Sequence, residues 1–282
     1  MDTLVQYFEN IPSLHRTIIL VGGLTFFLTL ESIVPLFRFN YKKWRHAGIN
    51  IFFTITTILV NFLLAFALIK ASSWATENQF GMLQWINGNV WVQLILGLLV
   101  LDFISSWLIH WIEHKVPLLW KFHVIHHSDQ QIDTTTANRH HPGESVFRLI
   151  FTVLAVIIVG APIWLIFLYQ SLSAMFSQFN HSNIAIPKWL DDALMWVFVT
   201  PNMHRVHHHY RLPYSDRNYG NIFSFWDRLL RTMVLADNKS LVYGIDTYMD
   251  RPEAEDIVTM LKIPFKEYRP QPQYDSEENL PV

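Results

Sequence analysis

Long runs of apolar residues with very few charges dominate the first two-thirds of this 282-residue chain. Three of these runs, residues 17–37, 49–69 and 90–109, each carry at most one charged side chain. Each is about 20 residues long, which is the length that a helix needs to cross the hydrocarbon core of a bilayer. No cleavable signal pattern precedes the first run, so we expect it to remain as a span. The pattern therefore predicts three membrane-spanning helices.

A fourth apolar run, residues 149–180, is too long for one simple crossing, since a straight helix of that length would extend for about 48 Å. Gly160, Ala161 and Pro162 interrupt it, and histidine-rich segments flank it on both sides. A single crossing would separate those segments by the membrane. We therefore predict a hairpin that turns near Gly160, with arms that are tilted or partly re-entrant. The expected fold is a single all-α integral membrane domain over residues 1–282, with three spans, a hydrophobic hairpin and a helical cap.

Basic residues indicate how the chain is oriented. The first connection between spans holds four of them: Arg38, Lys42, Lys43 and Arg45. The second connection, residues 71–89, has one charged side chain, Glu77. Because positive charges favour the cytoplasmic side, we predict that the first connection and the end of the third span near His110 are cytoplasmic, and that the N-terminus is outside.

Two later segments carry different signals. The amphipathic stretch Pro187–Val199 contains Trp189 and Trp196, and it is predicted to lie as a helix in the membrane interface, where tryptophan is favoured. The tail from Arg251 to Val282 contains five prolines and many charges. We predict that this tail is soluble and partly extended.

Composition narrows the chemistry. The chain is 51% apolar and 16% charged and has a net charge of −2, which gives no indication of a nucleic-acid partner. It contains no cysteine, so disulfides, thiolate zinc sites, iron–sulfur clusters and cysteine nucleophiles are excluded. Any bound metal must be held by nitrogen and oxygen atoms.

Twelve of the fourteen histidines fall between His110 and His209, in the pattern H-x3-H, H-x2-H-H, H-H, H and H-x2-H-H-H. Neutral imidazole is a common metal ligand, and residues at i, i+3 and i+4 project from one side of a helix. Eight histidines are predicted metal ligands: His110, His114, His123, His126, His127, His204, His207 and His208. Since four to six ligands fill one ion, this number indicates two metals. The remote His15 and His46 are predicted to be surface residues.

The remaining histidines of the region follow less regular spacing. His141 precedes a proline and His181 ends the hairpin, and both return to the face where the clusters meet, so we expect both to be ligands. His140 and His209 adjoin stronger candidates but point about 100° away on a helix. We expect these two to support a ligand or to face solvent.

Polar residues follow the third span at intervals of four: Asp102, Ser106, His110 and His114. A carboxylate at membrane depth is costly, so Asp102 either orients a histidine or lines a substrate path, or it forms a hydrogen bond inside the bundle. Glu144 is a second carboxylate that could orient a histidine. Glu113 stands in the order H-x2-E-H rather than H-E-x2-H, so the sequence does not indicate a zinc protease.

These histidine boxes, separated by a hydrophobic hairpin, resemble the fatty acid hydroxylase/sterol desaturase superfamily over residues 94–232. The resemblance extends to Arg139–Pro142, Asn180–Asn183, Thr200–His208, Asn218–Asn221 and Trp226–Arg228. The context of Pro117–Trp120 and Thr134–Ala137 looks like that of bacterial sterol-desaturase-like members and the related alkylglycerol monooxygenases.

The resemblance implies a membrane-embedded non-haem di-iron oxygenase that hydroxylates or desaturates a lipid. It implies two iron ions on the histidines named above, with zinc able to replace them in isolated protein. It also implies O2 as co-substrate and an external electron donor, either a redox partner protein or a pterin. A metal site on the cytoplasmic face of a bacterial inner membrane, rather than of the endoplasmic reticulum, is the expected location.

Two other classes of function compete with this hypothesis. A histidine-lined metal transporter should carry ligands near the middle of several spans, whereas these histidines lie at span ends and between spans. A membrane protein with structural zinc and no turnover would have the same ligands, and iron content together with an O2-dependent product would distinguish it from an oxygenase.

Overall fold

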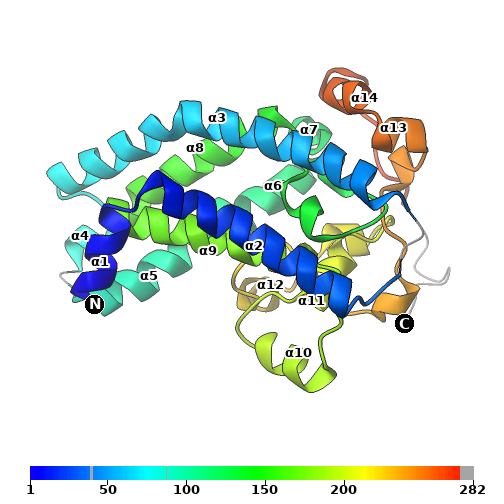
Figure 1. The fold of residues 1–282 in the computed structure, drawn as a ribbon. Coiled ribbons are helices and arrows are strands. Elements are labelled where there is room, and N and C mark those ends of the chain that lie inside the picture. The colour runs from blue at the N-terminus through cyan, green and yellow to red at the C-terminus, as the bar shows by residue number, and fades with distance from the viewer. Residues whose placement is uncertain (39–40, 87, 274–282) are drawn as a thin grey trace.

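Long helices lie side by side along one direction and carry a cap of short helices at one end (Figure 1). The computed structural model describes residues 1–38, 41–86 and 88–273. Within these ranges the regular structure is helical, apart from three isolated β-bridges. The predicted all-α fold is confirmed.

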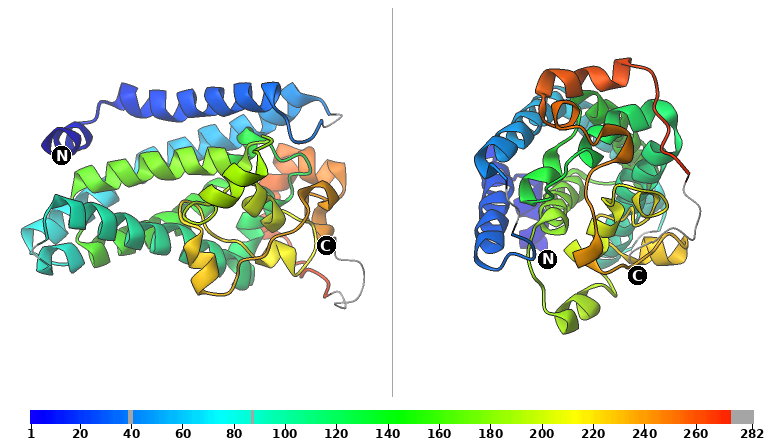
Figure 2. Two further views of the ribbon diagram at one scale, coloured as in Figure 1. Left: turned by 90° about the horizontal axis from the view of Figure 1, so that it is seen from below. Right: turned by 90° about the vertical axis from the view of Figure 1, so that its right-hand side faces the viewer.

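The bundle contains the apolar helices. These are α1 (Asp2–Glu9), α2 (Ser13–Ile33), α3 (Lys43–Glu77), α4 (Met82–Trp85), α5 (Val90–Asp102), α8 (Pro142–Val159) and α9 (Ile163–His181). A π-helical segment, η1 (Phe103–Leu108), continues α5 directly into α6 (Ile109–Lys115). Helix α3 packs along α8, α2 packs along α9, and α5 contacts both arms of the hairpin. Figure 2 shows α2 along one edge of this bundle.

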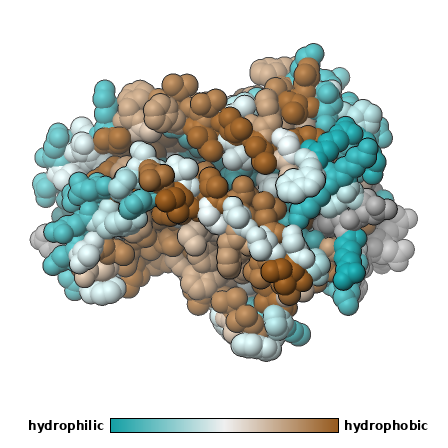
Figure 3. All heavy atoms as spheres, viewed as in Figure 1, coloured by the Kyte–Doolittle hydropathy of each residue, from teal (hydrophilic) through white to brown (hydrophobic). Residues whose placement is uncertain are grey.

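Four helical segments are long and apolar enough to cross a membrane: α2, α3 with α4, α5 with α6, and α8. Their outer surfaces expose large apolar side chains, such as Ile18, Phe62 and Leu63. Figure 3 shows apolar residues across the middle of one face and hydrophilic residues toward its two ends. Apolar surface of this extent is expected in lipid and not in water. The chain is an integral membrane protein, as the apolar runs predicted.

The predicted hairpin turns at Gly160. This glycine follows α8 in a left-handed conformation, with φ 66°, and α9 begins three residues later. Gly81, with φ 105°, lies against it, and a β-carbon at Gly81 would be 2.3 Å from the backbone nitrogen of Gly160. Two glycines therefore allow the α3–α4 connection to close over the tip of the hairpin.

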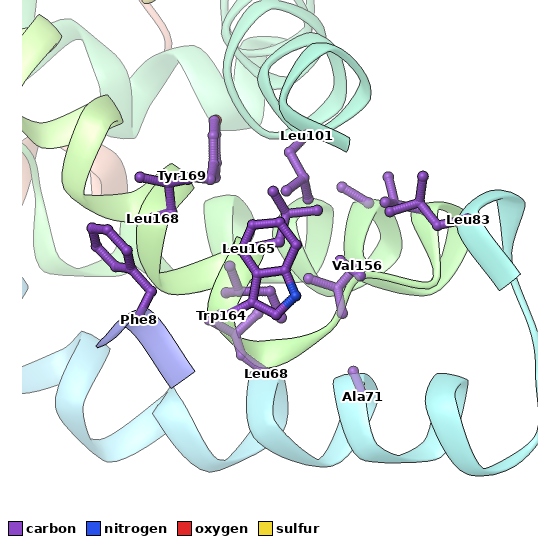
Figure 4. Packing of buried hydrophobic residues seen from close by; sticks show 14 of the residues in the cluster. Phe8, Leu68, Ala71, Leu83, Leu101, Val156, Trp164, Leu165, Leu168 and Tyr169 are labelled. Atoms are coloured by element: carbon purple, nitrogen blue, oxygen red, sulfur yellow. The ribbon is translucent and has the colours of Figure 1, made fainter. Parts of the chain in front are cut away.

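The main apolar core lies between the hairpin and the helices around it. Trp164 and Leu165 at the start of α9 pack near Leu68 of α3, Leu101 of α5 and Val156 of α8 (Figure 4). In a membrane such side chains stabilise the bundle through close van der Waals packing, because the surrounding lipid is as apolar as they are. This core holds the hairpin in place and so returns His181 to the end of the bundle where α6 and α7 lie.

Short helices form the cap. They are α7 (Pro117–His127), η2 (Thr134–Asn138), α10 (Lys188–Leu194), α11 (Pro201–His207), η3 (Tyr214–Asp216), α12 (Phe225–Leu229), η4 (Asn238–Ser240), η5 (Asp246–Tyr248), α13 (Arg251–Glu255), α14 (Ile257–Lys262) and η6 (Ile263–Phe265). Pro117 starts a new helix after α6, because proline is tolerated in the first turn of a helix but not in its interior. Helix α10 projects from the body in Figures 1 and 2, with Trp189 and Trp196 both 72% exposed. It is shorter than predicted and ends at Leu194 because Met195 and Val199 turn into the interior.

The C-terminal tail is not simply extended. From Arg251 it first forms α13, α14 and η6, and Met260 and Ile263 are buried against α7 and α3. An apolar patch within a charged segment explains this difference from the prediction. Residues 266–273 have no regular structure, and residues 274–282 lie outside the described residues.

Candidate metal centre

Nine histidines meet in two neighbouring groups at the cap end of the bundle. In each group, one ring nitrogen from every residue lies within 4.8 Å of the corresponding nitrogens of the others. Group A consists of His110, His114, His123, His127 and His207. Group B consists of His126, His181, His204 and His208. The groups adjoin, since the rings of His127 and His208 stack with centroids 4.8 Å apart.

Each H-x2-H-H box supplies both groups, in reciprocal fashion. On α7 the i and i+4 residues, His123 and His127, enter group A, while His126 between them enters group B. At α11 the i and i+4 residues, His204 and His208, enter group B, while His207 enters group A. Residues i and i+4 differ by about 40° around a helix, whereas the i+3 residue lies about 100° from i+4. Each H-x2-H-H box therefore directs two histidines toward one group and the third toward the other.

Burial keeps these imidazoles neutral. All members of both groups are buried, except His114, which is partly buried. Burial lowers the pKa of His123 to about 4 and holds the pKa of five further residues well below the usual value: His126, His127, His204, His207 and His208. Neutral imidazole is the form that binds a metal.

Group A contains an electrostatic conflict that a cation would remove. The Nδ1 atoms of His110 and His207 lie 2.9 Å and 2.6 Å from the backbone carbonyl oxygens of Tyr219 and Arg217. A carbonyl oxygen can only accept, so each Nδ1 carries the ring proton and each Nε2 carries a lone pair. These two Nε2 atoms lie 2.9 Å apart. Lone pairs at this distance repel each other unless a positive ion lies among them, so the donor set fits a metal ion.

Group B has the same character. His181 donates from Nδ1 to the carbonyl oxygen of Ser177 at 2.7 Å, which leaves a lone pair on its Nε2. That Nε2 lies 3.1 Å from the Nε2 atoms of His126, His204 and His208. The Nδ1 atoms of those three residues have no hydrogen-bond partner among the described residues, although they are buried. Four nitrogens thus converge on a point suited to a second metal ion.

A charged layer supports group A from behind. The Nδ1 atom of His123 lies 3.0 Å from Glu144 Oε1, so Glu144 orients this histidine, as the sequence suggested. Arg148 donates to Glu144 at 2.8 Å and to Glu113 at 2.6 Å, and the Nδ1 atom of His140 lies 3.0 Å from Glu144. Both carboxylates are completely buried. The sequence indicated Glu144 but gave no role to Glu113 or Arg148, because these two residues meet only when α8 packs against η1 and α7.

Asp102 forms a hydrogen bond inside the bundle rather than contacting a histidine. Its carboxylate accepts from the backbone N–H groups of Ile222 and Phe223, both at 3.3 Å, and from the indole of Trp226 at 3.2 Å. The π-helical segment Phe103–Leu108 shifts the helical register between Asp102 and the histidines, which a spacing of four residues does not anticipate. Asp102 therefore holds the loop before α12 against α5.

Tyr219 and Asp227 position the loop that orients His110. The Tyr219 carbonyl binds His110, and its backbone N–H and that of Gly220 donate to Asp227, both at 2.9 Å. Asp227 also accepts from the indole of Trp107 at 2.9 Å. The sequence showed these residues only as part of the resemblance, without a role.

Several histidines lie outside both groups. His141 was expected to be a ligand, but its Nδ1 accepts from the Gly143 N–H at 2.9 Å, where it caps the start of α8, and its ring packs on Phe122. His140 stacks on His126 with centroids 4.4 Å apart, in the supporting position expected for it. His141 lies outside both groups because it is the N-cap of α8, which starts at Pro142.

The predictions for three other histidines have mixed outcomes. His209 is buried and accepts from the Val242 N–H at 3.2 Å, so it neither faces solvent nor contacts either group. His46 is buried rather than at the surface, 2.8 Å from Asp129, because α3 packs against η2. His15 is exposed, as predicted.

Comparison with known proteins agrees with this geometry. Residues 94–232 match the model of the fatty acid hydroxylase family, and this segment contains every member of groups A and B. This segment, which is just under half of the chain, belongs to the fatty acid hydroxylase family.

The chain is also similar to a lipid hydroxylase and to several monooxygenases. The chain is 29% identical over 140 residues to the ornithine lipid hydroxylase OlsE of Rhizobium tropici, covering 50% of this chain and 41% of that protein. It is 30% identical over 170 residues to human alkylglycerol monooxygenase, covering 58% of this chain and 34% of that protein. The Caenorhabditis elegans alkylglycerol monooxygenase is 31% identical over 136 residues, which cover 48% of this chain and 26% of that protein. The chain thus spans less than half the length of these relatives. No solved structure matches it.

Proposed function

We propose that this protein is a membrane-bound non-haem di-iron oxygenase that hydroxylates or desaturates a lipid. The observation that carries the proposal is the convergence of nine neutral imidazoles on two adjacent points, with lone pairs facing one another at 2.9–3.1 Å. The lipid hydroxylases and monooxygenases among its relatives support a lipid substrate.

The two groups would hold one iron ion each. Bound there, the pair of irons would supply the redox chemistry that lets O2 and two external electrons act on an unactivated C–H bond. In hydroxylation, one oxygen atom enters the lipid and the other leaves as water, with two protons taken up. In desaturation, the lipid loses two hydrogens and both oxygen atoms leave as water.

The residues of the chain prepare this chemistry in three ways. The carbonyls of Tyr219 and Arg217 fix the ring orientation of His110 and His207, so that each presents Nε2 to the metal. Glu144 orients His123 in the same manner. Burial of both groups limits the access of bulk water, which protects a reactive site.

The proposed location is the cytoplasmic face of a bacterial inner membrane. The concentration of basic residues in the connection between α2 and α3, at the same end of the bundle as the histidines, supports this orientation. An electron donor, either a protein or a pterin, would approach from that side. The hydrophobic bundle would let a lipid enter laterally from the bilayer.

Two linked measurements test the proposal. Iron per chain is measured in protein purified from cells grown with iron, and lipids are compared by mass spectrometry in cells with and without the protein. The expected result is about two irons per chain and a lipid product that gains one oxygen or loses two hydrogens. Protein that holds only zinc after growth and iron reconstitution, with no product under O2, would contradict it.

A further inference from the structure

A cavity of about 360 Å³ opens beside the cap end of α2. It is bounded by the last turn of α2, the chain that follows, the first turn of α3 and the segment after α9. The wall residues that matter here are Glu31, Ile33, Arg38, Tyr41, Lys43 and Asn183. Of the two hydrophilic ends of the face in Figure 3, the right-hand one lies where α2 ends and α3 begins. The cavity therefore lies where the apolar surface of the bundle meets its polar end.

The walls of the cavity carry more positive than negative charge. Lys43 and Arg38 both line it, and Arg38 forms no ion pair with any residue that the structure describes. Glu31 is the acidic member of the wall, and its Oε1 atom lies 3.6 Å from Lys43 Nζ. The next carboxylate, Asp133, is buried behind the wall and accepts from the hydroxyl of Tyr41 at 2.7 Å. One positive charge thus remains available to an anion.

An apolar surface leads directly to the cavity. Ile33 is 70% exposed and Val34 is 41% exposed at the end of α2, and Phe26 is 60% exposed further along the same helix. These side chains would lie in the acyl-chain region of a bilayer. An amphiphile with its chains along α2 would place its headgroup at Arg38 and Lys43. Basic pockets between membrane helices bind anionic lipid headgroups in this way.

We propose that this cavity binds the phosphate-bearing headgroup of an anionic membrane lipid. Arg38 and Lys43 would hold the phosphate, and the lipid chains would cover the exposed side of α2. Asn183, on the opposite wall, follows His181 of group B by two residues. A lipid bound here would therefore lie beside the histidine end of α9. The proposal does not depend on catalysis and stands apart from the proposed function.

The test is a binding titration of the full-length protein in a neutral detergent, followed by native mass spectrometry. Phosphatidylglycerol, phosphatidylcholine and inorganic phosphate are titrated separately. We expect phosphatidylglycerol to bind most tightly and to weaken as the salt concentration rises. The double variant Arg38→Gln/Lys43→Gln should bind it at least about tenfold more weakly. The control Lys188→Gln/Lys239→Gln removes the same charge from exposed positions elsewhere and should bind as the wild type does.

Each other outcome overturns the proposal. Equal binding of both lipids would show that headgroup charge is not recognised, and phosphate that displaces the lipid completely would assign the site to the free anion. Unchanged binding by the double variant would place the lipid elsewhere. If the double variant unfolds, Arg38→Gln alone decides the matter, because Arg38 has no ion pair with the described residues and its loss should leave the fold intact.

Discussion

The carboxylate of Glu31 accepts a hydrogen bond from the backbone N–H of Asn183, at 3.1 Å, two residues beyond His181. The same oxygen accepts from the backbone N–H and the hydroxyl of Thr134, at 3.1 Å and 2.9 Å. Of the residues of α2, all of which the structure describes, Glu31 alone is buried. A helix that is otherwise exposed is thus attached to the metal-binding end of the bundle through one carboxylate.

Replacement of Glu31 should therefore be costly. Glu31→Ala leaves the N–H groups of Asn183 and Thr134 without their acceptor, and an unsatisfied buried group costs about 1–3 kcal/mol. We expect the free energy of unfolding in detergent to fall by about 1–3 kcal/mol or more. The exposed Glu77→Ala serves as control and should change it by less than about 0.5 kcal/mol. Equal effects of the two variants would contradict the role assigned to Glu31.

Loss of a single histidine from either group should remove metal. His207→Ala removes a nitrogen from group A, and His126→Ala removes one from group B, so both variants should lose bound metal and activity. Metal per chain, measured by elemental analysis, is the decisive quantity. His209→Ala is the matched control, since this residue follows His208 directly but lies outside both groups. Full metal content in either of the first two variants would refute the ligand assignment.

Removal of metal should also destabilise the fold. Without a cation, the facing lone pairs of His110 and His207 repel each other at 2.9 Å, and a ligand that binds only the folded state stabilises it. We expect the midpoint of thermal unfolding to fall by several degrees after chelation and to recover when Fe²⁺ or Zn²⁺ is added. A midpoint that stays constant while elemental analysis confirms metal loss would show that the groups do not need an ion.

Acid should destabilise the metal-free protein. Burial lowers the pKa of His123 and of His209 to about 4, below the unfolded value of about 6.5. The unfolded chain therefore binds more protons than the folded chain between these values, so stability is complete above about pH 6.5 and falls as the pH drops toward 4. Unfolding by denaturant, followed at about pH 7 and about pH 5 with chelator present, should show a lower midpoint at the acid pH. A higher midpoint there would contradict the sign.

The orientation can be tested because the chain has no cysteine of its own. Two single-cysteine variants are compared, Ser240→Cys and Gln79→Cys. Ser240 is in the cap, Gln79 follows the end of α3 that is remote from the cap, and both are exposed. In inside-out membrane vesicles, a membrane-impermeant maleimide should label position 240 and leave position 79 unlabelled. Intact cells should give the reverse pattern. Labelling of both positions from one side would rule out the proposed topology.

The sequence by itself determined the features that depend on local pattern. Apolar length predicted the spans, Gly160 and Pro162 predicted the turn of the hairpin, and the spacing of the H-x2-H-H boxes predicted a site for two metals. The spans and the turn are confirmed, and the two-metal site stays a prediction that the two histidine groups fit. Helix length, turn conformation and the direction of side chains on a helix follow from a few neighbouring residues.

The tertiary structure alone decided how those residues are used. It placed His126 and His127 in different groups and His141 outside both groups. It also showed that Asp102 binds the loop before α12 and no histidine. The reason is that a ring nitrogen is directed by partners that are remote in sequence, as the carbonyl of Tyr219 directs His110 across 109 positions. Such partners come into contact only when the hairpin core, α5 and the cap have packed together, so a local sequence pattern cannot predict the contact.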